Sequence, residues 1–284
     1  MRSPRTYNGV ILLRREALKY LARTRLNQLE PFLLSAENVH ALIARKIKNQ
    51  TPFTVLRPGA TEAEGIEFFI RHRLGLRLHI RGYARRYRQR ALQNSGIIAH
   101  DNFQLDQVFL EYVRQTIDAD LLGIASFSYG AFAIAQIKLS RGDPVCRMSD
   151  LEPWTAMQDN LESWTSSLEG KRVLVVHPFR RTILAQFHNR KRIRGVSSFL
   201  PDFDLEVVVP PRTLTNSFGL EWWGEHLKDT IQRCKDAQFD VAIVGAGSYG
   251  LPIAGELAKM GKVAIHLGGS TQLLFGIVGK RWRN

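Results

Sequence analysis

A repeated local pattern constrains the fold of this chain more than any other feature. The pattern is a short apolar run, then a loop of small or polar residues, then a helical stretch. Most of the runs are continuously apolar, as strands that are buried on both faces tend to be. Strands that alternate with helices form βαβ crossovers, and such crossovers build a parallel sheet with helices on both faces. The predicted strands are Phe53–Leu56, Leu121–Ala125, Arg172–Val176, Leu205–Val209, Val241–Val244 and Val263–Leu267.

The first fifty residues predict helices instead of strands. Leucines recur at roughly helical spacing between Arg14 and Leu29. A second helix is predicted from Ser35 to Lys48, because Ser35 is a good N-cap residue and an apolar stripe follows it at helical spacing. The stripe consists of Val39, Leu42, Ile43 and Ile47.

These patterns predict an α/β fold with a doubly wound, mainly parallel, Rossmann-like sheet. The sheet is expected over residues 51–284, preceded by an N-terminal helical segment over residues 1–50. Residues 140–170 contain Gly142, Pro144, Pro153 and several Ser and Thr, which is typical of a connection. We therefore expect this stretch to join two halves of the sheet assembly.

Composition excludes several classes of protein. The chain has 284 residues and is 44% hydrophobic, which is enough apolar material to offset the entropy of ordering and to exclude intrinsic disorder. Its two cysteines, Cys146 and Cys234, exclude a disulfide scaffold and a cysteine zinc cluster, and they favour a reducing compartment. The apolar run Val10–Leu13 is too short for a secretory signal, so we expect a cytoplasmic protein.

Positive charge is concentrated in two stretches, against a formal net charge of +14. Arg71 to Arg90 contains eight arginines and no acidic residue, with Tyr83 and Tyr87 interleaved. A second cluster runs from Arg180 to Arg194. Such runs form either a solvated helix face or a surface for a polyanion. Because no recognised nucleic-acid module is present, we expect nucleic acid not to be the partner and keep peripheral contact with an anionic membrane as a prediction.

The loops that follow the predicted strands combine glycines with arginines. In a parallel sheet the carboxyl ends of the strands share one edge, where ligands bind. Glycines let backbone N–H groups approach an anion, and helix N-termini add partial positive charge. Arg57 and Arg212 add full charges, so the sequence predicts a bound phosphate or diphosphate. The candidate binding residues are Gly59, His177, Arg180, Arg181, Gly245, Gly247, Ser248, Gly268 and Gly269.

Gly245-x-Gly247-x-x-Gly250 matches the dinucleotide fingerprint, because it follows a predicted strand and opens a helix. The complete fingerprint also needs an acidic residue at the end of the next strand to bind the ribose. That strand ends Ala264-Ile265-His266-Leu267, without an acid. A dinucleotide-dependent oxidoreductase therefore remains only an alternative.

Arg57-x-Gly59-x-x-Glu62 places a guanidinium and a carboxylate around one loop. Such a carboxylate can hold a divalent metal against a diphosphate or act as general base on an acceptor hydroxyl. Glu64, in the same helix, is a second candidate. The structural interpretation is that Glu62 is an early-turn residue favoured by the helix dipole.

Four segments together resemble the GT-D-fold glycosyltransferases, of the type found in surface-polysaccharide synthesis. The first, residues 47–62, resembles the family signature in which a strand runs into Arg-x-Gly-Asp-Gly-Glu. The others are Ala119-Asp120-Leu121-Leu122-Gly123-Ile124, the pair Asp240–Gly245 with Gly261–Gly269, and Leu168–Phe179.

The resemblance implies transfer of a sugar from a nucleotide-sugar donor, with Mn²⁺ or Mg²⁺ bridging the donor diphosphate and the Asp-x-Glu pair. Position by position, Arg57, Gly59 and Glu62 match the signature, but the family Asp falls on Ala60 and the second Gly on Thr61. Three alternatives follow: Glu64 substitutes, Glu62 holds the metal through waters, or arginines neutralise the diphosphate without metal.

The sequence therefore predicts a glycosyltransferase that uses a glycan or lipid-linked acceptor. Its expected catalytic residues are Glu62, Arg57 and Glu64, with Glu62 as the metal ligand. The alternatives are a nucleic-acid-binding module that uses Arg71 to Arg90, and the dinucleotide-dependent oxidoreductase.

Overall fold

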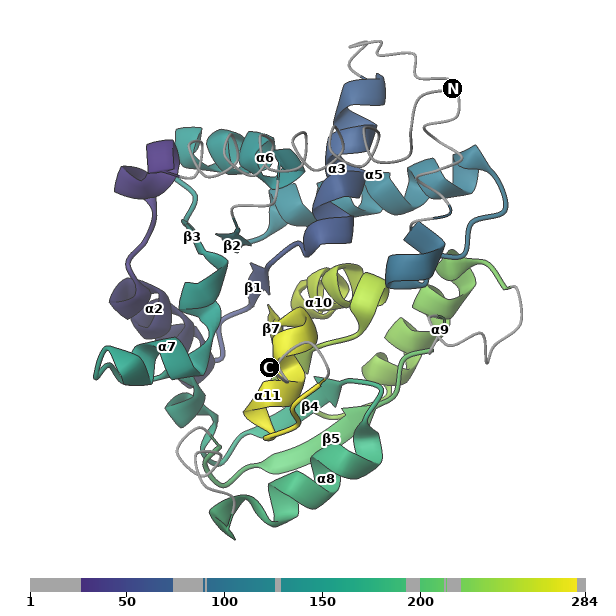
Figure 1. The fold of residues 1–284 in the computed structure, drawn as a ribbon. Coiled ribbons are helices and arrows are strands. Elements are labelled where there is room, and N and C mark those ends of the chain that lie inside the picture. The colour runs from purple at the N-terminus through teal and green to yellow at the C-terminus, as the bar shows by residue number, and fades with distance from the viewer. Residues whose placement is uncertain are drawn as a thin grey trace, which may run out of the picture.

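Seven parallel strands form one sheet in the computed structural model, which describes residues 27–73, 89, 91–125, 129–192, 200–211, 213 and 221–279. The strand order is β3-β2-β1-β7-β6-β4-β5, and every neighbouring pair is parallel (Figure 1). The strands are β1 (Phe53–Leu56), β2 (Leu121–Ile124), β3 (Val145–Arg147), β4 (Arg172–Val176), β5 (Asp204–Val208), β6 (Val241–Val244) and β7 (Val263–His266).

One row of apolar residues crosses the sheet from β5 to β2. Each residue in the row pairs in register with the next: Val207, Val175, Ile243, Ile265, Val55 and Leu121. All six side chains belong to the same buried cluster on one face of the sheet. Because the row is continuous, β1, β7, β6 and β4 end at nearly the same level, and the loops that follow them start along one edge.

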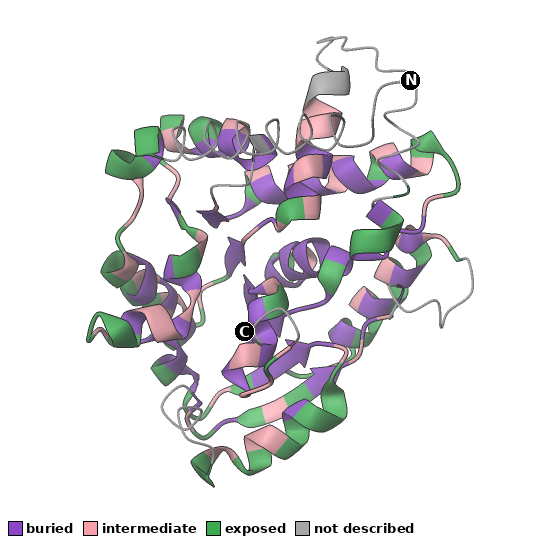
Figure 2. Cartoon of the chain, viewed as in Figure 1, coloured by how far each residue is buried: buried purple, intermediate pink, exposed green. Residues whose placement is uncertain are grey.

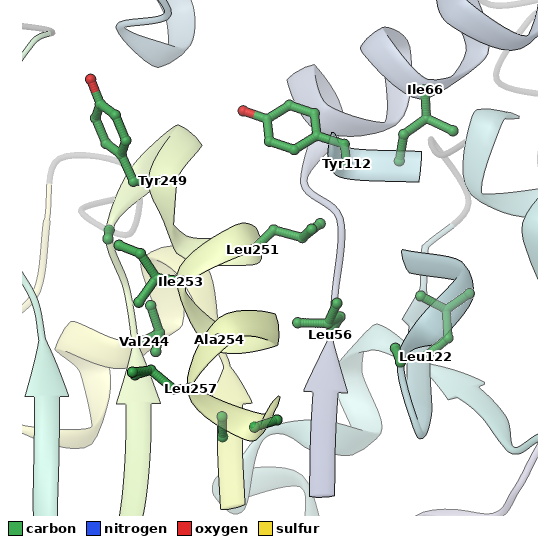
Figure 3. Close-up of a cluster of buried hydrophobic side chains, with 14 of the residues drawn as sticks. Leu56, Ile66, Tyr112, Leu122, Val244, Tyr249, Leu251, Ile253, Ala254 and Leu257 are labelled. Carbon is green, nitrogen blue, oxygen red and sulfur yellow. The ribbon is translucent and has the colours of Figure 1, made fainter. Parts of the chain in front are cut away.

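Helices cover both faces of the sheet, which confirms the doubly wound α/β fold. One layer contains α3 (Ala60–Arg73), α5 (Asn102–Asp118), α6 (Tyr129–Ser140), α9 (Trp223–Lys235) and α10 (Gly250–Lys259). Figure 3 shows the centre of this layer, where Leu251 and Leu257 of α10 lie among Leu56 and Val244 of the strands. The other layer contains α2 (Ala36–Lys48), α7 (Pro153–Gln158), α8 (Arg180–His188) and α11 (Thr271–Leu274).

The helices that cover the sheet have buried residues and exposed residues (Figure 2). β1, β2, β6 and β7 are purple throughout, whereas the edge strand β5 and the helices combine buried and exposed residues. Within the described ranges, none of the helices combines the length and the apolar character that crossing a bilayer requires. Both cysteines are buried free thiols, and burial raises the pKa of Cys234 to about 12, so neither is a ready nucleophile.

The predicted strands agree closely with the structure. β1, β4 and β6 have the predicted bounds, β2 and β7 each end one residue earlier, and β5 is shifted by one residue. The edge strand β3 was missed, and it lies inside residues 140–170, which were predicted to be only a connection. A three-residue run directly after Pro144 is too short to show strand periodicity, and its pairing with β2 supplies the missing stability.

The second predicted helix is confirmed as α2, and the Ser35 hydroxyl accepts a hydrogen bond from the backbone N–H of Asn38 at 3.3 Å. Val39, Ile43 and Ile47 are buried against the sheet. Of the helix predicted between Arg14 and Leu29, only residues 27–29 lie within the described part, and they are helical.

Gly130 lies where α6 crosses α3, and it generates a prediction about stability. A Cβ at this position would run into the backbone carbonyl of Ala63 and the backbone N–H of Glu67. Because two helix backbones cannot move apart without disturbing the core, we expect Gly130→Ala to lower the free energy of unfolding by about 1–3 kcal/mol in urea titrations.

Gly142, just beyond the other end of α6, is the matched control. It has a φ of +79° in open space, and asparagine tolerates that conformation, so Gly142→Asn should cost less than about 1 kcal/mol. If the Gly130→Ala protein were as stable as the parent, the prediction would be contradicted. The clash would then cost no more than the gain in helix propensity, which favours alanine by about 1 kcal/mol.

Candidate functional site

The candidate site lies along the carboxyl ends of the four central strands. β1 and β6 lead into helices on one face, α3 and α10, whereas β7 and β4 lead into α11 and α8 on the other. Chains leaving neighbouring strands therefore diverge between β1 and β7, between β7 and β6, and between β6 and β4. Points of this kind are where open α/β sheets bind ligands.

Arg57, directly after β1, is held by two partners from distant parts of the chain. Its Nη1 donates to Oε1 of Glu152 at 2.8 Å, and its Nη2 donates to the hydroxyl of Ser270 at 3.1 Å. The Ser270 hydroxyl in turn donates to the same Glu152 oxygen at 2.6 Å. The three side chains form a closed triangle that links the loops after β1 and β7 to the start of α7.

The triangle changes the expected role of Arg57. The side chains of Arg57 and Glu152 are only 11% and 19% exposed, so the ion pair is largely withdrawn from water. The guanidinium charge is already balanced by a carboxylate, and two of its donors are engaged. Arg57 therefore fixes the geometry of the edge, and a diphosphate near it would meet a neutral pair instead of an isolated cation.

Glu152 is a site residue that the sequence did not reveal. It precedes Pro153 at the N-cap position of α7, but its side chain makes no capping hydrogen bond there. Instead the carboxylate reaches Arg57 and Ser270, which are 95 and 118 residues away in the chain. No local pattern signals a contact at that separation.

Glu62 lies in the first turn of α3 and is 9% exposed. Its Oε2 lies 2.6 Å from the position that a Cβ on Gly59 would occupy, so the carboxylate folds back over the loop after β1. This place suits a negative charge because the helix dipole is positive there. The position of Glu62 is thus explained by the helix dipole alone. It also lies beside the loop after β1, as a general base or a metal ligand would have to.

Glu64 follows Glu62 by two residues on α3, and helix geometry sets them on different sides of that helix. Residues two apart on a helix point about 200° away from each other, so both carboxylates cannot face one ion. Ala60, where the related signature has Asp, is exposed at the start of the same helix. Among the described residues, no group of three or more His, Cys, Asp or Glu side chains is arranged to hold a metal. The donor set around Glu62 does not fit the bridging Mn²⁺ or Mg²⁺ that the resemblance implies.

Two of the three fingerprint glycines are explained by packing. A Cβ on Gly245 would lie 2.6 Å from the Thr271 hydroxyl and 2.7 Å from the carbonyl oxygen of Gly268, and a Cβ on Gly250 would lie 2.7 Å from Nε2 of His266. The loop after β6 therefore packs directly on β7 and the loop after it. Gly247 differs, because it is exposed, has a φ of +57° and has open space around it.

The loop after β6 is held in place from two helices. The Ser248 hydroxyl accepts a hydrogen bond from Nε1 of Trp223 at 3.1 Å, and the Ser248 carbonyl accepts one from the Tyr112 hydroxyl at 2.8 Å. Trp223 also stacks on Tyr249, with ring centroids 5.5 Å apart and planes 13° apart. Ser248 is 1% exposed, so its side chain supports the loop from beneath.

His266, at the end of β7, occupies the place where a dinucleotide fingerprint would have its ribose-binding acid. The ring is buried, and burial together with the nearby Arg57 cation lowers its pKa to about 3. Among the described residues, its Nδ1 finds no hydrogen-bond partner. The imidazole is therefore neutral at physiological pH, and it faces the start of α10 instead of a ribose.

His177 and two arginines follow β4. The His177 ring is buried at 3% exposure, and its Nδ1 accepts a hydrogen bond from the backbone N–H of Phe179 at 3.1 Å. In the neutral ring the proton is accordingly assigned to Nε2, which is a donor. Arg180 and Arg181 are exposed in the first turn of α8, at the same edge of the sheet.

Of the other predicted site residues, some lie at the same edge of the sheet and some lie outside the described residues. Gly268 has a φ of +54° and is partly exposed, and Gly269 is exposed beside it. Arg212 lies outside the described residues, as does most of the stretch from Arg71 to Arg90.

Comparisons with known proteins add little to this description. Neither protein-family models nor curated proteins match the chain. Among solved structures, the chain is similar to a selenomethionine-substituted structure of domain of unknown function 1792, with 14% identity and a TM-score of 0.33. The likeness covers 79% of this chain and 81% of that one. We therefore infer function from the residues of this chain.

The buried triangle generates a prediction about coupling. Replacing either charged residue, by Glu152→Gln or Arg57→Met, should lower the free energy of unfolding by about 1–3 kcal/mol, because each leaves a desolvated partner unsatisfied. The double variant should lose clearly less than the sum, giving a coupling energy of about 1–3 kcal/mol in a double-mutant cycle measured by urea unfolding.

The exposed pair Arg233–Asp229 on α9 provides the control, with side chains 43% and 66% exposed. Its coupling energy should be at most about 0.5 kcal/mol, because water and salt screen such pairs. Equal coupling energies for the two pairs would contradict a special role for the Arg57–Glu152–Ser270 triangle.

Proposed function

We propose that this protein is a glycosyltransferase that moves a sugar from a nucleoside-diphosphate sugar to a glycan or lipid-linked acceptor. One observation carries the proposal: the level ends of β1, β4, β6 and β7 gather a carboxylate, an imidazole, arginines and two positive-φ glycine turns, one exposed and one partly exposed, along one edge. Such an edge can receive a diphosphate and can also offer a base. The sequence resemblance to GT-D-fold glycosyltransferases points to the same chemistry.

Binding of the donor diphosphate would depend on the loops after β6, β7 and β4. The turns at Gly247 and Gly268 expose backbone groups that can approach phosphate oxygens without side-chain obstruction. The Nε2–H of His177 adds a donor, and Arg180 and Arg181 add positive potential at the start of α8. Ser248 supports this arrangement from below, because its own hydroxyl is engaged by Trp223.

The reaction would break the bond between the sugar C1 and the diphosphate oxygen and form a bond from C1 to the acceptor oxygen. Negative charge then grows on the departing diphosphate, where fixed donors and cations stabilise it. The Glu62 carboxylate would take the proton from the acceptor hydroxyl. Arg57 would act through its bonds to Glu152 and Ser270, which fix the loops after β1 and β7.

A divalent metal is not part of this proposal. The family signature would supply Mn²⁺ or Mg²⁺ with an Asp at position 60, but Ala60 offers no ligand atom, and Glu64 is two residues from Glu62 and so on a different side of the helix. Of the alternatives left open by the sequence, we favour neutralisation of the diphosphate by the chain's own cations and donors. We also propose a cytoplasmic location, because two free thiols fit a reducing compartment.

A thermal-shift panel tests the proposed donor class. A nucleoside-diphosphate sugar should raise the melting temperature, and at about 100 times its dissociation constant it adds about 2.7 kcal/mol of stability. The shift should persist in EDTA. NAD and single-stranded oligonucleotides are the comparison ligands. Stabilisation by NAD alone would favour the oxidoreductase, and stabilisation by oligonucleotide alone would favour the binding module.

Glu62→Gln tests the base. It keeps the size of the side chain and removes the charge, so turnover of the nucleotide sugar found in the panel should fall by about 10²–10⁴ while donor binding persists. Glu37→Gln is the matched control, because Glu37 is also in the first turn of its helix but is exposed on α2. If both variants kept the parent's turnover, Glu62 would be only an early-turn residue.

A further inference from the structure

The outer face of α8 mixes exposed apolar residues with cations. Phe179 and Leu184 are 38% and 37% exposed, and Arg180, Arg181 and Arg192 of the same segment are exposed as well. We call these five residues the α8 face. It lies at the margin of the molecule, outside β5, where Figure 2 shows α8 with much of its surface exposed.

The charge of this region is one-sided. From Lys171 to Pro201 the chain contains eight Lys and Arg residues and no Asp or Glu. The next acid, Asp202, is engaged by Arg190 and by Lys191. Among the described residues, no carboxylate lies within ion-pair distance of the three arginines of the α8 face. Its positive charge is thus not balanced within the described part of the chain.

Helix stability does not account for the arginines. Arg180 and Arg181 stand in the first turn of α8, where the helix dipole disfavours positive charge. Arg190 behaves differently, because its side chain lies over the Phe187 ring at 4.1 Å and donates to the Phe187 carbonyl. The chain therefore uses Arg190 for internal packing, whereas Arg180, Arg181 and Arg192 are exposed.

We propose that the α8 face binds the surface of an anionic lipid bilayer. Apolar side chains set among arginines are the pattern of a helix that lies in the membrane interface, with the apolar groups at the acyl boundary and the guanidinium groups on lipid phosphates. Leu184 favours a bilayer over nucleic acid, because an aliphatic side chain adds to binding at the acyl boundary, whereas the phosphates of a nucleic acid need only the arginines.

The position of the α8 face gives this binding a consequence for the candidate site. Three residues separate the end of β4 from the start of α8, so the first turn of α8 lies at the edge that carries His177 and the glycine turns. A bilayer bound there would meet the protein at the rim of the site. This inference rests on the proposed function in one respect: it favours a lipid-linked acceptor over a free glycan. Vesicle binding itself can be measured without a nucleotide sugar and without turnover.

Vesicle co-sedimentation of the full chain tests the proposal. The protein should bind vesicles of phosphatidylcholine with 30% phosphatidylglycerol, an assay composition chosen at about one-third anionic lipid, and not vesicles of pure phosphatidylcholine. Binding should weaken as salt rises. Each basic residue near such a surface contributes about fivefold in affinity, so Arg181→Glu with Arg192→Glu should lower the affinity by about 25-fold or more.

The control is the charge-matched pair Lys48→Glu with Lys235→Glu, at the ends of α2 and α9 that lead into β1 and β6 on the opposite edge of the sheet. Its loss of affinity should be severalfold smaller. Leu184→Gln changes no charge and should weaken vesicle binding several-fold while leaving the nucleotide-sugar thermal shift unchanged. Glutamate in the first turn of α8 favours the helix, so unfolding will not mimic the result.

Three results would overturn the proposal. They are absence of binding to the anionic vesicles, equal losses in the α8 variant and the opposite-edge control, and binding of an oligonucleotide through Arg181 and Arg192 without vesicle binding. If vesicle binding follows the α8 face but no nucleotide sugar shifts the melting temperature, the membrane surface stands and the proposed transferase activity fails.

Discussion

The pairing of β1 with β7 is the contact on which the candidate site depends. Val55 lies in register with Ile265, so two strands more than two hundred residues apart become neighbours at the centre of the sheet. Only this pairing brings the loop that holds Arg57 to the loop that holds Ser270. Glu152 then closes the triangle from the β3 side, and the edge acquires a fixed shape before any ligand is present.

Much of the sheet could be predicted because burial on both faces leaves a strong local signal. β1, β4 and β6 consist almost entirely of β-branched and other apolar residues, and their bounds follow from that alone. The order of the strands could not be predicted, since no local pattern says that β7 inserts between β1 and β6. The edge strand β3 escaped prediction for a related reason: its three residues depend on β2 for their structure.

The site was predicted less completely than the fold, and the glycines show why. A glycine in a sequence indicates that another group packs closely on the backbone there, but it does not show whether that group belongs to a ligand or to the same chain. Gly245 and Gly250 accommodate Thr271, Gly268 and His266 of the same chain, whereas Gly247 and Gly268 have the left-handed backbone that only such residues adopt easily. The sequence also offered Arg57 as a free cation, because Glu152 lies 95 residues away and becomes its neighbour only through the fold.

The anchoring of the loop after β6 bears on the entropy of recognition. Tyr112 and Trp223 fix the carbonyl oxygen and the hydroxyl of Ser248, and Tyr249 stacks on Trp223, so the turn at Gly247 loses its conformational freedom when the chain folds. A ligand that meets this turn orders little that is still mobile. Its contacts therefore contribute more fully to affinity, and small differences between ligands in how they fit a rigid turn become differences in selectivity.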